Sequence, residues 1–587
     1  MTRNTAEIVV DTLAEWGVDV VFGLPGDGIN GIMEALRTRQ DRIRFVQVRH
    51  EEAAAFMACG YAKLTGRIGC CLATTGPGGI HLLNGLYDAK FDRAPVVAVT
   101  GLPYHDLIDT FTQQDVDHPR LFQDVAAYTA RIMGPAHAAN VTGLACRTAL
   151  ARRGVAHIAV PIDVQEEPES TTHPSPRNTV PHAIGAYAEG QRLPALAEVE
   201  RAAEILNAGR RVVILAGQGA LGARDELLRT AELLGAPIIK ALLGKAVVPD
   251  DHPYTTGGIG HLGTIPSHEA MAQCDTLLIA GSSFPYVEYY PKPGQARAVQ
   301  IDLDPQRIGL RYPVEAALVG DVRTTLQALN GHLAPKADRV FLEQARLGMV
   351  EWRHLLAEAA MRPGTPMKPQ RIARELSARL AEDAIVLSDS GQHTGFLAQN
   401  VEMRGTQMFA VSGTLASMGC ALPYAIAAAV AYPGRQVVAF VGDGGLAMVL
   451  GELATCVRYN LPVKIVVVKN NTYGQIKWEQ MLFLGNPEFG CDLQPIDFAK
   501  VAEGFGLKAF KAVEPDQCGP ALDAALAEPG PALVEAEVDP NEPFLPPKPP
   551  AKYVEHLRAA LAQGTPDREQ IERRLAEEPA RTLMQTK

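Results

Sequence analysis

The stretch VVAFVGDGGLAMVLGELATCVRYNLPVKIVVVKN, residues 437–470, decides the fold class. It begins and ends with runs of β-branched and apolar residues, and the segment between them has helical character. A strand, a helix and a second strand in this order form a βαβ unit, whose two strands are parallel. This part of the chain is therefore predicted to form a parallel sheet with helices on its faces.

Polar residues stand where the two predicted strands end. Asp443 lies in the turn Gly442-Asp443-Gly444-Gly445, and Asn470 follows the second strand. Because parallel strands place their carboxyl ends at one edge of a sheet, these side chains, 470 − 443 = 27 residues apart, should share a crevice. Mg²⁺ prefers oxygen ligands, and a helix that begins after glycines offers free N–H groups to a phosphate. A lone Gly-Asp-Gly is more often only a turn, but the combination predicts a site for a metal-bound diphosphate.

The alternation of strand-like and helix-like segments recurs in three passages. The predicted fold is therefore α/β, with three consecutive doubly wound parallel-sheet domains at 1–167, 195–335 and 369–540. Between and after them we expect a Pro-, Ser- and Thr-rich linker at 168–194, a linker helix at 336–368 and a C-terminal tail of helical character at 541–587. The strand candidates are VDVVFGL, RFVQV, IGCCLATT and PVVAVTG in the first domain, and RVVILAG, APIIKAL, DTLLIAG and ARAVQIDLD in the second.

Composition and charge exclude several classes of protein. With 55 Lys and Arg against 66 Asp and Glu, the net charge of −11 provides no field that attracts nucleic acid. The nine cysteines lack a C-x-x-C pair and the N-terminus lacks the apolar core of a signal peptide, so we expect reduced core thiols and a cytoplasmic location. The uncharged stretch Ala416 to Tyr432 contains Pro423 and is interpreted as a buried helix. The tail has no evident basic, amphipathic face for a membrane.

The motif GDGG…NN at this spacing resembles the thiamine diphosphate motif of the pyruvate oxidase and acetohydroxyacid synthase family. FGLPGDGINGIMEAL, RHEEAAAFMACGYAKLTG and TTGPGGIHLLNGLYDA resemble the pyrimidine-binding domain of the same family. The resemblance implies a pyrimidine-binding first domain, a central domain of FAD- or nucleotide-binding type, and a third domain that binds the diphosphate and Mg²⁺. It also implies a homodimer or homotetramer with the cofactor at the subunit interface.

The resemblance assigns roles to individual residues. Glu51 matches the family glutamate that hydrogen-bonds the aminopyrimidine ring and favours the imino tautomer, whose nitrogen removes the thiazolium proton; this contributes roughly 10²- to 10⁴-fold in rate. Asp443, the Asn470 side chain and the Thr472 carbonyl would hold Mg²⁺, and Met418 would be the bulky apolar residue that bends the cofactor. Alone, Glu51 would be a helix-start carboxylate and Met418 core filler. The remaining implied contacts of thiamine diphosphate are Gly26, Ser390, Gly391, Gln392, Ser417, Gly442, Gly444, Gly445, Tyr473, Gly474 and Gln475.

The middle domain bears on the fate of the substrate. GGIGHLG, GSSFPYVEYYP, QIDLDPQRIG and LVGD resemble the flavin-binding domain of quinone-linked pyruvate oxidases, and the arginine of the acetohydroxyacid synthase pattern is missing from GSSFPY. Asp302 ends a predicted strand where a ribose-binding acid could stand. The FAD contacts implied in this way are Gly260, His261, Leu262, Gly263, Ser282, Ser283, Phe284, Asp302 and Asp321.

The expected reaction is decarboxylation of a 2-oxo acid such as pyruvate through an enamine, with oxidation through flavin favoured. Two departures keep an acetolactate synthase-type carboligase open as the alternative. NNTYGQIKWEQM carries Gln475 where oxidases carry an aromatic residue, and DTFTQQDVDHP matches the family's Phe-Gln loop best at Gln114, which leaves the role of Phe111 open. A catalytically idle nucleotide-binding protein is a third reading, against which the intact Glu51, Asp443 and Asn470 argue.

Overall fold

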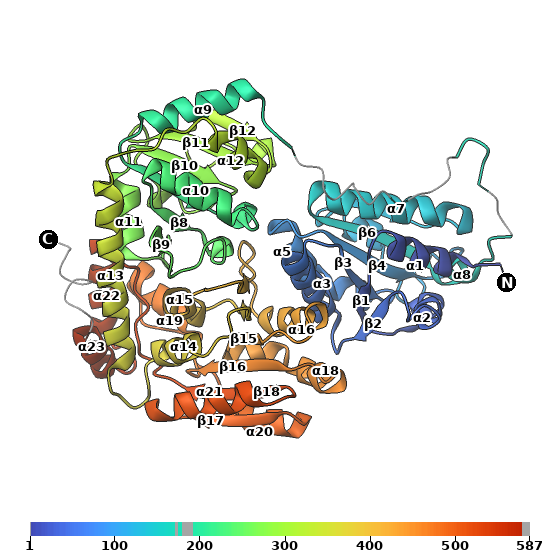
Figure 1. Ribbon diagram of the computed structural model, residues 1–587. Helices are drawn as coiled ribbons and strands as arrows, with labels where there is room; N and C mark the ends of the chain where they lie inside the picture. The colour runs from blue at the N-terminus through green and yellow to red at the C-terminus, as the bar shows by residue number, and fades with distance from the viewer. Residues whose placement is uncertain (1, 171–173, 179–182, 184–191, 578–587) are drawn as a thin grey trace.

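Three six-stranded sheets, each covered by helices, make up the protein (Figure 1). The computed structural model describes residues 2–170, 174–178, 183 and 192–577. The strand orders are β2-β1-β3-β4-β6-β5, β12-β11-β10-β7-β8-β9 and β14-β13-β15-β16-β18-β17. Neighbouring strands within these sheets pair in parallel, so the predicted α/β class is confirmed.

The first sheet contains the four strands expected there and two more. Its strands are β1 (Val20–Gly23), β2 (Arg44–Gln47), β3 (Gly69–Ala73), β4 (Val96–Leu102), β5 (Ala126–Arg131) and β6 (Val155–Pro161). Its helices are α1 (Thr5–Glu15), α2 (Asn30–Arg37), α3 (Glu51–Thr65), α4 (Pro77–His81), α5 (Leu83–Phe91), α6 (His118–Leu121), α7 (Pro135–Arg152) and α8 (Ile162–Glu166). The unpredicted β5 is an edge strand of half-exposed residues, which lacks the apolar run of a buried strand.

The middle domain follows the same plan. Its strands are β7 (Val212–Ala216), β8 (Ile238–Lys240), β9 (Thr255–Gly258), β10 (Thr276–Ala280), β11 (Arg297–Asp302) and β12 (Ala316–Val319). The helices are α9 (Leu196–Ala208), α10 (Arg224–Leu234), α11 (Ile265–Gln273) and α12 (Val322–Asn330), and the expected linker helix is α13 (Val340–Met361). Residues 171–173, 179–182 and 184–191 of the predicted linker lie outside the described residues.

The third domain contains the decisive βαβ unit. Its strands are β13 (Ile385–Ser388), β14 (Met408–Ala410), β15 (Val437–Gly442), β16 (Val463–Lys469), β17 (Lys508–Ala512) and β18 (Ala532–Glu537). Its helices are α14 (Pro369–Ser377), α15 (Gln392–Asn400), α16 (Ala421–Ala431), α17 (Asp443–Met448), α18 (Leu453–Arg458), α19 (Gly474–Glu479), α20 (Phe498–Phe505) and α21 (Cys518–Ala527). β15 pairs with β16 so that Gly442 lies opposite Val468, and both chains therefore leave the sheet at one edge.

The predicted C-terminal tail contains two helices that pack on the third domain. α22 (Ala551–Ala562) and α23 (Arg568–Glu577) share a small apolar cluster with Trp478 and Met481. The Arg574 guanidinium lies 2.5 Å from the carboxylate of Asp539.

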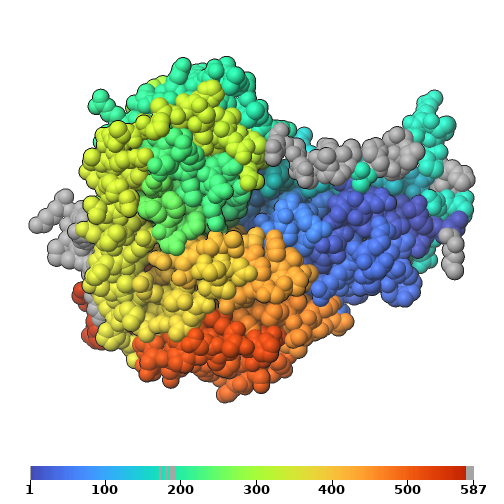
Figure 2. Space-filling model, in the orientation of Figure 1, coloured from blue at the N-terminus to red at the C-terminus, as the bar shows by residue number. Residues whose placement is uncertain are grey.

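The first and third domains share one hydrophobic core. α3 packs on α16, and the cluster of buried residues that contains Phe56 continues without a break to Tyr424 (Figure 1). In the space-filling view the blue first domain adjoins the orange part of the third (Figure 2). The stretch from Ala416 to Tyr432, interpreted from sequence as a buried helix, contains α16, and the residues of this helix up to Ala429 are buried. In the part of the chain that the structure describes, no helix has the length and apolar character needed to cross a membrane.

Gly60 should be essential to the close approach of α3 and α16. A Cβ atom at Gly60 would lie 2.7 Å from the Tyr424 ring and 3.0 Å from the Tyr424 Cα. We expect Gly60→Ala to destabilise the protein by about 1–3 kcal/mol through overpacking. The measurement is the midpoint of thermal unfolding. Gly504→Ala is the matched control, since a Cβ there meets nothing within 4 Å; an equal fall in both variants would contradict the proposed fit.

Candidate functional site

Asp443 begins α17 at the carboxyl end of β15. Its side chain is 6% exposed, and its two oxygens accept hydrogen bonds from the N–H groups of Gly444, at 2.9 Å, and Asn471, at 2.6 Å. Burial raises the pKa of Asp443, while these backbone N–H groups act in the opposite direction. The carboxylate is thus held in place from both loops of the predicted crevice.

Asn470 and Thr472 lie on the second of these loops. The Asn470 Oδ1 accepts from the Thr472 N–H at 3.2 Å, and its Nδ2 donates to Gln392 Oε1 at 3.3 Å. The Thr472 hydroxyl is buried without a hydrogen-bond partner among the described residues. The structure therefore brings together the three residues expected to bind Mg²⁺ and adds Gln392 beside them.

Glycines let the surrounding loops approach one another closely. A Cβ at Gly444 would lie 2.8 Å from the Tyr473 ring, and one at Gly474 would overlap the side-chain oxygen of Gln392. His393 lies against Gly442, and its Nε2 is buried without a partner; burial lowers the pKa of His393 to about 4, so the ring is neutral. The side-chain oxygens of this site are suitable ligands for a cation such as Mg²⁺. The buried polar atoms without a partner and the closely packed glycine loops suit a bound diphosphate.

Met418 lies in the loop between β14 and α16. The next two residues, Gly419 and Cys420, donate their N–H groups to Asp389 at 3.0 and 3.1 Å. Asp389 also accepts from the Ser390 N–H, and burial raises its pKa to about 6 against the effect of these donors. Asp389 thereby connects the loop that carries Ser417 and Met418 to the loop of Ser390 and Gly391. Both loops contain residues that are expected to contact the cofactor.

The first-domain part of the site is centred on Glu51, the first residue of α3. Glu51 is 6% exposed, and its Oε2 lies 3.0 Å from the Nδ1 atom of His81. A Cβ at Gly78 would lie 3.3 Å from the Glu51 carboxylate, so the start of α4 packs against this side chain. Gly26 lies in the same region, since a Cβ there would overlap Thr74.

Gln114 reaches the same turn. It accepts a short hydrogen bond from the Thr75 hydroxyl, and a Cβ at Gly76 would lie 2.8 Å from the Gln114 Cβ. Phe111 is fully exposed to solvent. The role of Gln114 stays a prediction, and that of Phe111 stays open.

Hydrogen bonds join the first and third domains beside these residues. The buried carboxylate of Glu452 accepts from the N–H groups of Arg49, at 2.8 Å, and His50, at 3.2 Å, directly before Glu51. Asn84 donates to the Ser417 hydroxyl at 3.0 Å. Among the described residues no hydrogen bond or ion pair joins Glu51 itself to Asp443, Asn470 or Met418.

The residues expected to contact FAD lie on loops of the middle domain that follow its strands. Asp302 ends β11, but the guanidinium of Arg93 lies 3.3 Å from its carboxylate. Asp321 caps α12 by accepting the Thr324 N–H. Ser283 accepts from Arg307, the Ser282 hydroxyl accepts from the Phe284 N–H, and a Cβ at Gly260 would meet the Phe284 ring. These flavin contacts stay predictions.

The loop Gly260-His261-Leu262-Gly263 lies against the third domain. The Gly263 carbonyl accepts from Gln399, and the His261 ring lies 6.4 Å from that of Phe483 in an edge arrangement. Phe483 belongs to the segment that follows the Asn470 loop and α19. The predicted flavin loop therefore packs against the third domain at the end of α15 and at the segment after α19.

Sequence reasoning missed several residues of the site. His81 and Asn84 lie in the quoted stretch TTGPGGIHLLNGLYDA, and Asp389 and His393 flank the expected Ser390, Gly391 and Gln392, so their position in the motifs was a usable signal. Glu452 had none, because its partners are backbone groups some 400 residues away in the chain.

Comparisons with known proteins find related sequences along nearly the whole chain. Family models match residues 3–121, described as "Thiamine pyrophosphate enzyme, N-terminal TPP binding domain", 199–329, its "central domain", and 389–536, its "C-terminal TPP binding domain". The chain is 40% identical to the Bacillus subtilis protein YdaP over 93% of this chain and 94% of that protein. It is 33% identical to the pyruvate oxidase of Lactiplantibacillus plantarum, covering 91% and 89% of the two chains, and 31% identical to the acetolactate synthase of Mycobacterium bovis, covering 85% and 82%.

We expect Asp443→Ala to abolish Mg²⁺-dependent retention of thiamine diphosphate, because the substitution removes the only carboxylate of the proposed ligand set. Equilibrium dialysis with and without Mg²⁺ measures this retention. Asp523→Ala, at a solvent-exposed carboxylate on α21, is the control and should retain the cofactor. Full retention by the Asp443 variant would show that the metal is held elsewhere.

Proposed function

The chain belongs to the thiamine pyrophosphate enzyme family, and from this premise we propose that it decarboxylates pyruvate with thiamine diphosphate and Mg²⁺. The observation that carries the proposal is the convergence of Asp443, Asn470 and Thr472 at one sheet edge, with Glu51 buried at the start of α3. When bound, thiamine diphosphate supplies a carbon nucleophile and an electron sink for loss of CO₂.

The protein's own residues would bind and orient the reactants. Asp443 and the Asn470 side-chain oxygen would hold Mg²⁺ with the Thr472 carbonyl, and the adjacent glycine loops would admit the diphosphate. Glu51 would hold a proton at its carboxylate and share it with the aminopyrimidine ring. His81, 3.0 Å from that carboxylate, orients it.

We further propose that the two-carbon unit is oxidised through FAD bound by the middle domain. The contact of the 260–263 loop with Gln399 and Phe483 supports this, because it joins the predicted flavin loop to the domain that carries Asp443 and Asn470. Similarity to a pyruvate oxidase over nearly the whole chain is in keeping with it.

A carboligase of acetolactate synthase type is the second candidate, and two observations favour it. Gln475, in place of an aromatic residue, donates to Glu479 at 2.8 Å, so a polar pair occupies the segment after the metal site. Asp302, the predicted ribose-binding acid, is already paired with Arg93. Similarity to acetolactate synthases covers most of the chain as well.

We propose that the active enzyme is a homodimer or homotetramer in the cytoplasm. Glu51 forms no direct bond to the metal-site residues of its own chain within the described ranges, and large apolar side chains such as Phe111 and Phe489 are exposed near the two parts of the site. A second copy would complete the site and cover these side chains. All nine cysteines are buried thiols, which suits a reducing compartment.

Glu51→Gln should retain thiamine diphosphate but lose turnover by about 10²- to 10⁴-fold, because an amide cannot share its proton with the pyrimidine ring. Steady-state consumption of pyruvate, measured beside cofactor retention by dialysis, tests this. Glu52→Gln, the neighbour on the same helix, is the matched control and should keep turnover within about threefold, since its amide still accepts from Asn84. Normal turnover in Glu51→Gln would remove the proposed role.

The anaerobic absorbance spectrum of the protein with thiamine diphosphate, Mg²⁺ and FAD distinguishes the two candidate reactions. Bleaching of a bound flavin band after addition of pyruvate is the expected result, because two electrons then pass from the substrate to the flavin. A band that stays unbleached while acetolactate accumulates would establish the carboligase instead.

A further inference from the structure

A buried ion cluster of the first domain faces the loop that carries Met418. The Lys63 ammonium on α3 lies 2.7 Å from the Asp92 carboxylate and 3.2 Å from that of Asp88. The side chain of Lys63 is 9% exposed and the two aspartates are wholly buried. One cation and two anions in such surroundings need further hydrogen bonds to be stable.

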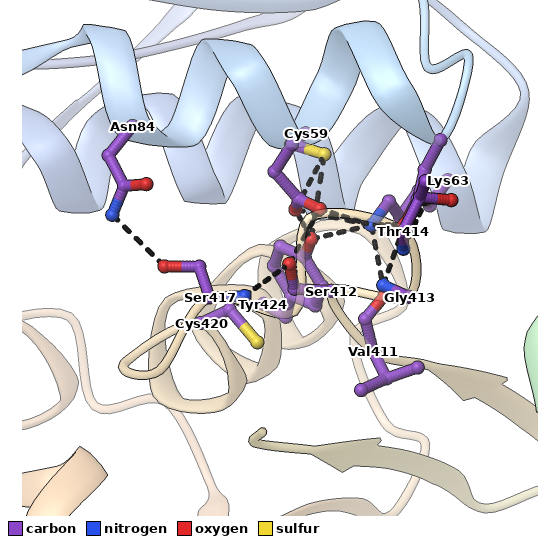
Figure 3. Close-up of polar contacts among 12 residues, drawn as sticks. Cys59, Lys63, Asn84, Val411, Ser412, Gly413, Thr414, Ser417, Cys420 and Tyr424 are labelled. Carbon is purple, nitrogen blue, oxygen red and sulfur yellow. Dashed lines mark hydrogen bonds and ion pairs between the residues drawn. The ribbon is translucent and has the colours of Figure 1, made fainter. Parts of the chain in front are cut away.

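The third domain supplies these hydrogen bonds from residues 411–414 and from the Tyr424 hydroxyl, which accepts from Lys63 and donates to Asp88. Lys63 donates to the Val411 carbonyl at 3.0 Å, and the Ser412 hydroxyl donates to Asp88 at 2.8 Å. The N–H groups of Gly413 and Thr414 each donate to Asp92 at 2.9 Å. Figure 3 shows Lys63 and Cys59 on their helix directly above this loop.

The rest of the loop depends on the same contacts. The Ser412 hydroxyl also accepts from the Ser417 N–H at 3.0 Å, while Asn84 holds the Ser417 side chain (Figure 3). Ala416 has a φ of 57°, in the left-handed region that a residue with a side chain seldom adopts. Such a backbone persists only where its surroundings fix it, and Asp389 fixes only the far end of the loop, at Gly419.

We propose that Lys63, Asp88 and Asp92 are positioning residues that hold the 411–418 loop in the shape that presents Met418 to thiamine diphosphate. The inference rests on the proposed function, since it assumes that Met418 lies against this cofactor. Asp88 acts through Ser412 and Ser417, whereas Lys63 and Asp92 act through the backbone of residues 411, 413 and 414. Loosening the loop would let Met418 withdraw, so the bound cofactor would lose the ring arrangement in which its own nitrogen removes the thiazolium proton.

The test follows proton exchange on the cofactor and needs no turnover. Asp92→Asn keeps the size of the side chain but has one acceptor oxygen for two backbone N–H groups. Ser412→Ala removes the link from Asp88 to Ser417. At saturating thiamine diphosphate and Mg²⁺, hydrogen–deuterium exchange at the thiazolium C2 should slow by about ten- to a hundredfold in both variants, because small displacements of a positioned group have effects of this size.

Two further variants separate positioning from general loosening. Cys59→Ala removes a contact to Asp88 at 3.3 Å that does not reach the loop, so its exchange should match that of the wild type. Ser412→Thr keeps the hydroxyl, so its exchange rate should be close to that of the wild type and faster than that of Ser412→Ala. This comparison tests the role of the hydroxyl even if Asp92→Asn does not fold. Wild-type exchange rates in both Asp92→Asn and Ser412→Ala would overturn the inference, as would equal slowing in Cys59→Ala. A wild-type protein that does not bind thiamine diphosphate would instead overturn the proposed function and this inference with it.

Discussion

The packing of α3 against α16 is the contact on which the arrangement of the site depends. α3 carries Glu51 at its first turn and Lys63 near its end, and α16 follows directly on the Met418 loop. Because apolar burial is strong but not directional, the shared core brings the two domains together without fixing their angle closely. Gly60 lets the helices meet closely enough for the polar contacts around them to form.

Those polar contacts supply the direction that the core lacks. Glu452 of the third domain accepts hydrogen bonds from the backbone N–H groups immediately before Glu51. Asp92 of the first domain accepts hydrogen bonds from backbone N–H groups of the Met418 loop. Each domain thus offers a buried carboxylate to the backbone of the other. Buried carboxylates that accept backbone N–H groups are satisfied only in one geometry, so the two contacts restrict how the domains can sit.

The sequence predicted the fold class, the βαβ unit and the grouping of Asp443 with Asn470, because these follow from strand ends at one sheet edge. Strands such as β5 and β9 were not predicted, because they are edge strands with exposed or glycine-rich sequences. The pairing of Asp302 with Arg93 and the reach of Glu452 to Arg49 could not be predicted either. Both join distant parts of the chain, and no local pattern records which domains touch.

The continuous core also bears on how such proteins can be rearranged. Sequence patterns divide the chain into three units of similar plan. Separating the first unit from the third would expose the apolar side of α3 and remove the hydrogen bonds that residues 411–414 make to Lys63, Asp88 and Asp92. Recombination of the first unit alone into another scaffold would therefore fail unless the new neighbour supplied an equivalent of α16 and its loop. The middle unit has core clusters of its own, but Leu242, Leu243 and Ala246 pack against the core of the third, so its exchange would also leave apolar side chains without their neighbours.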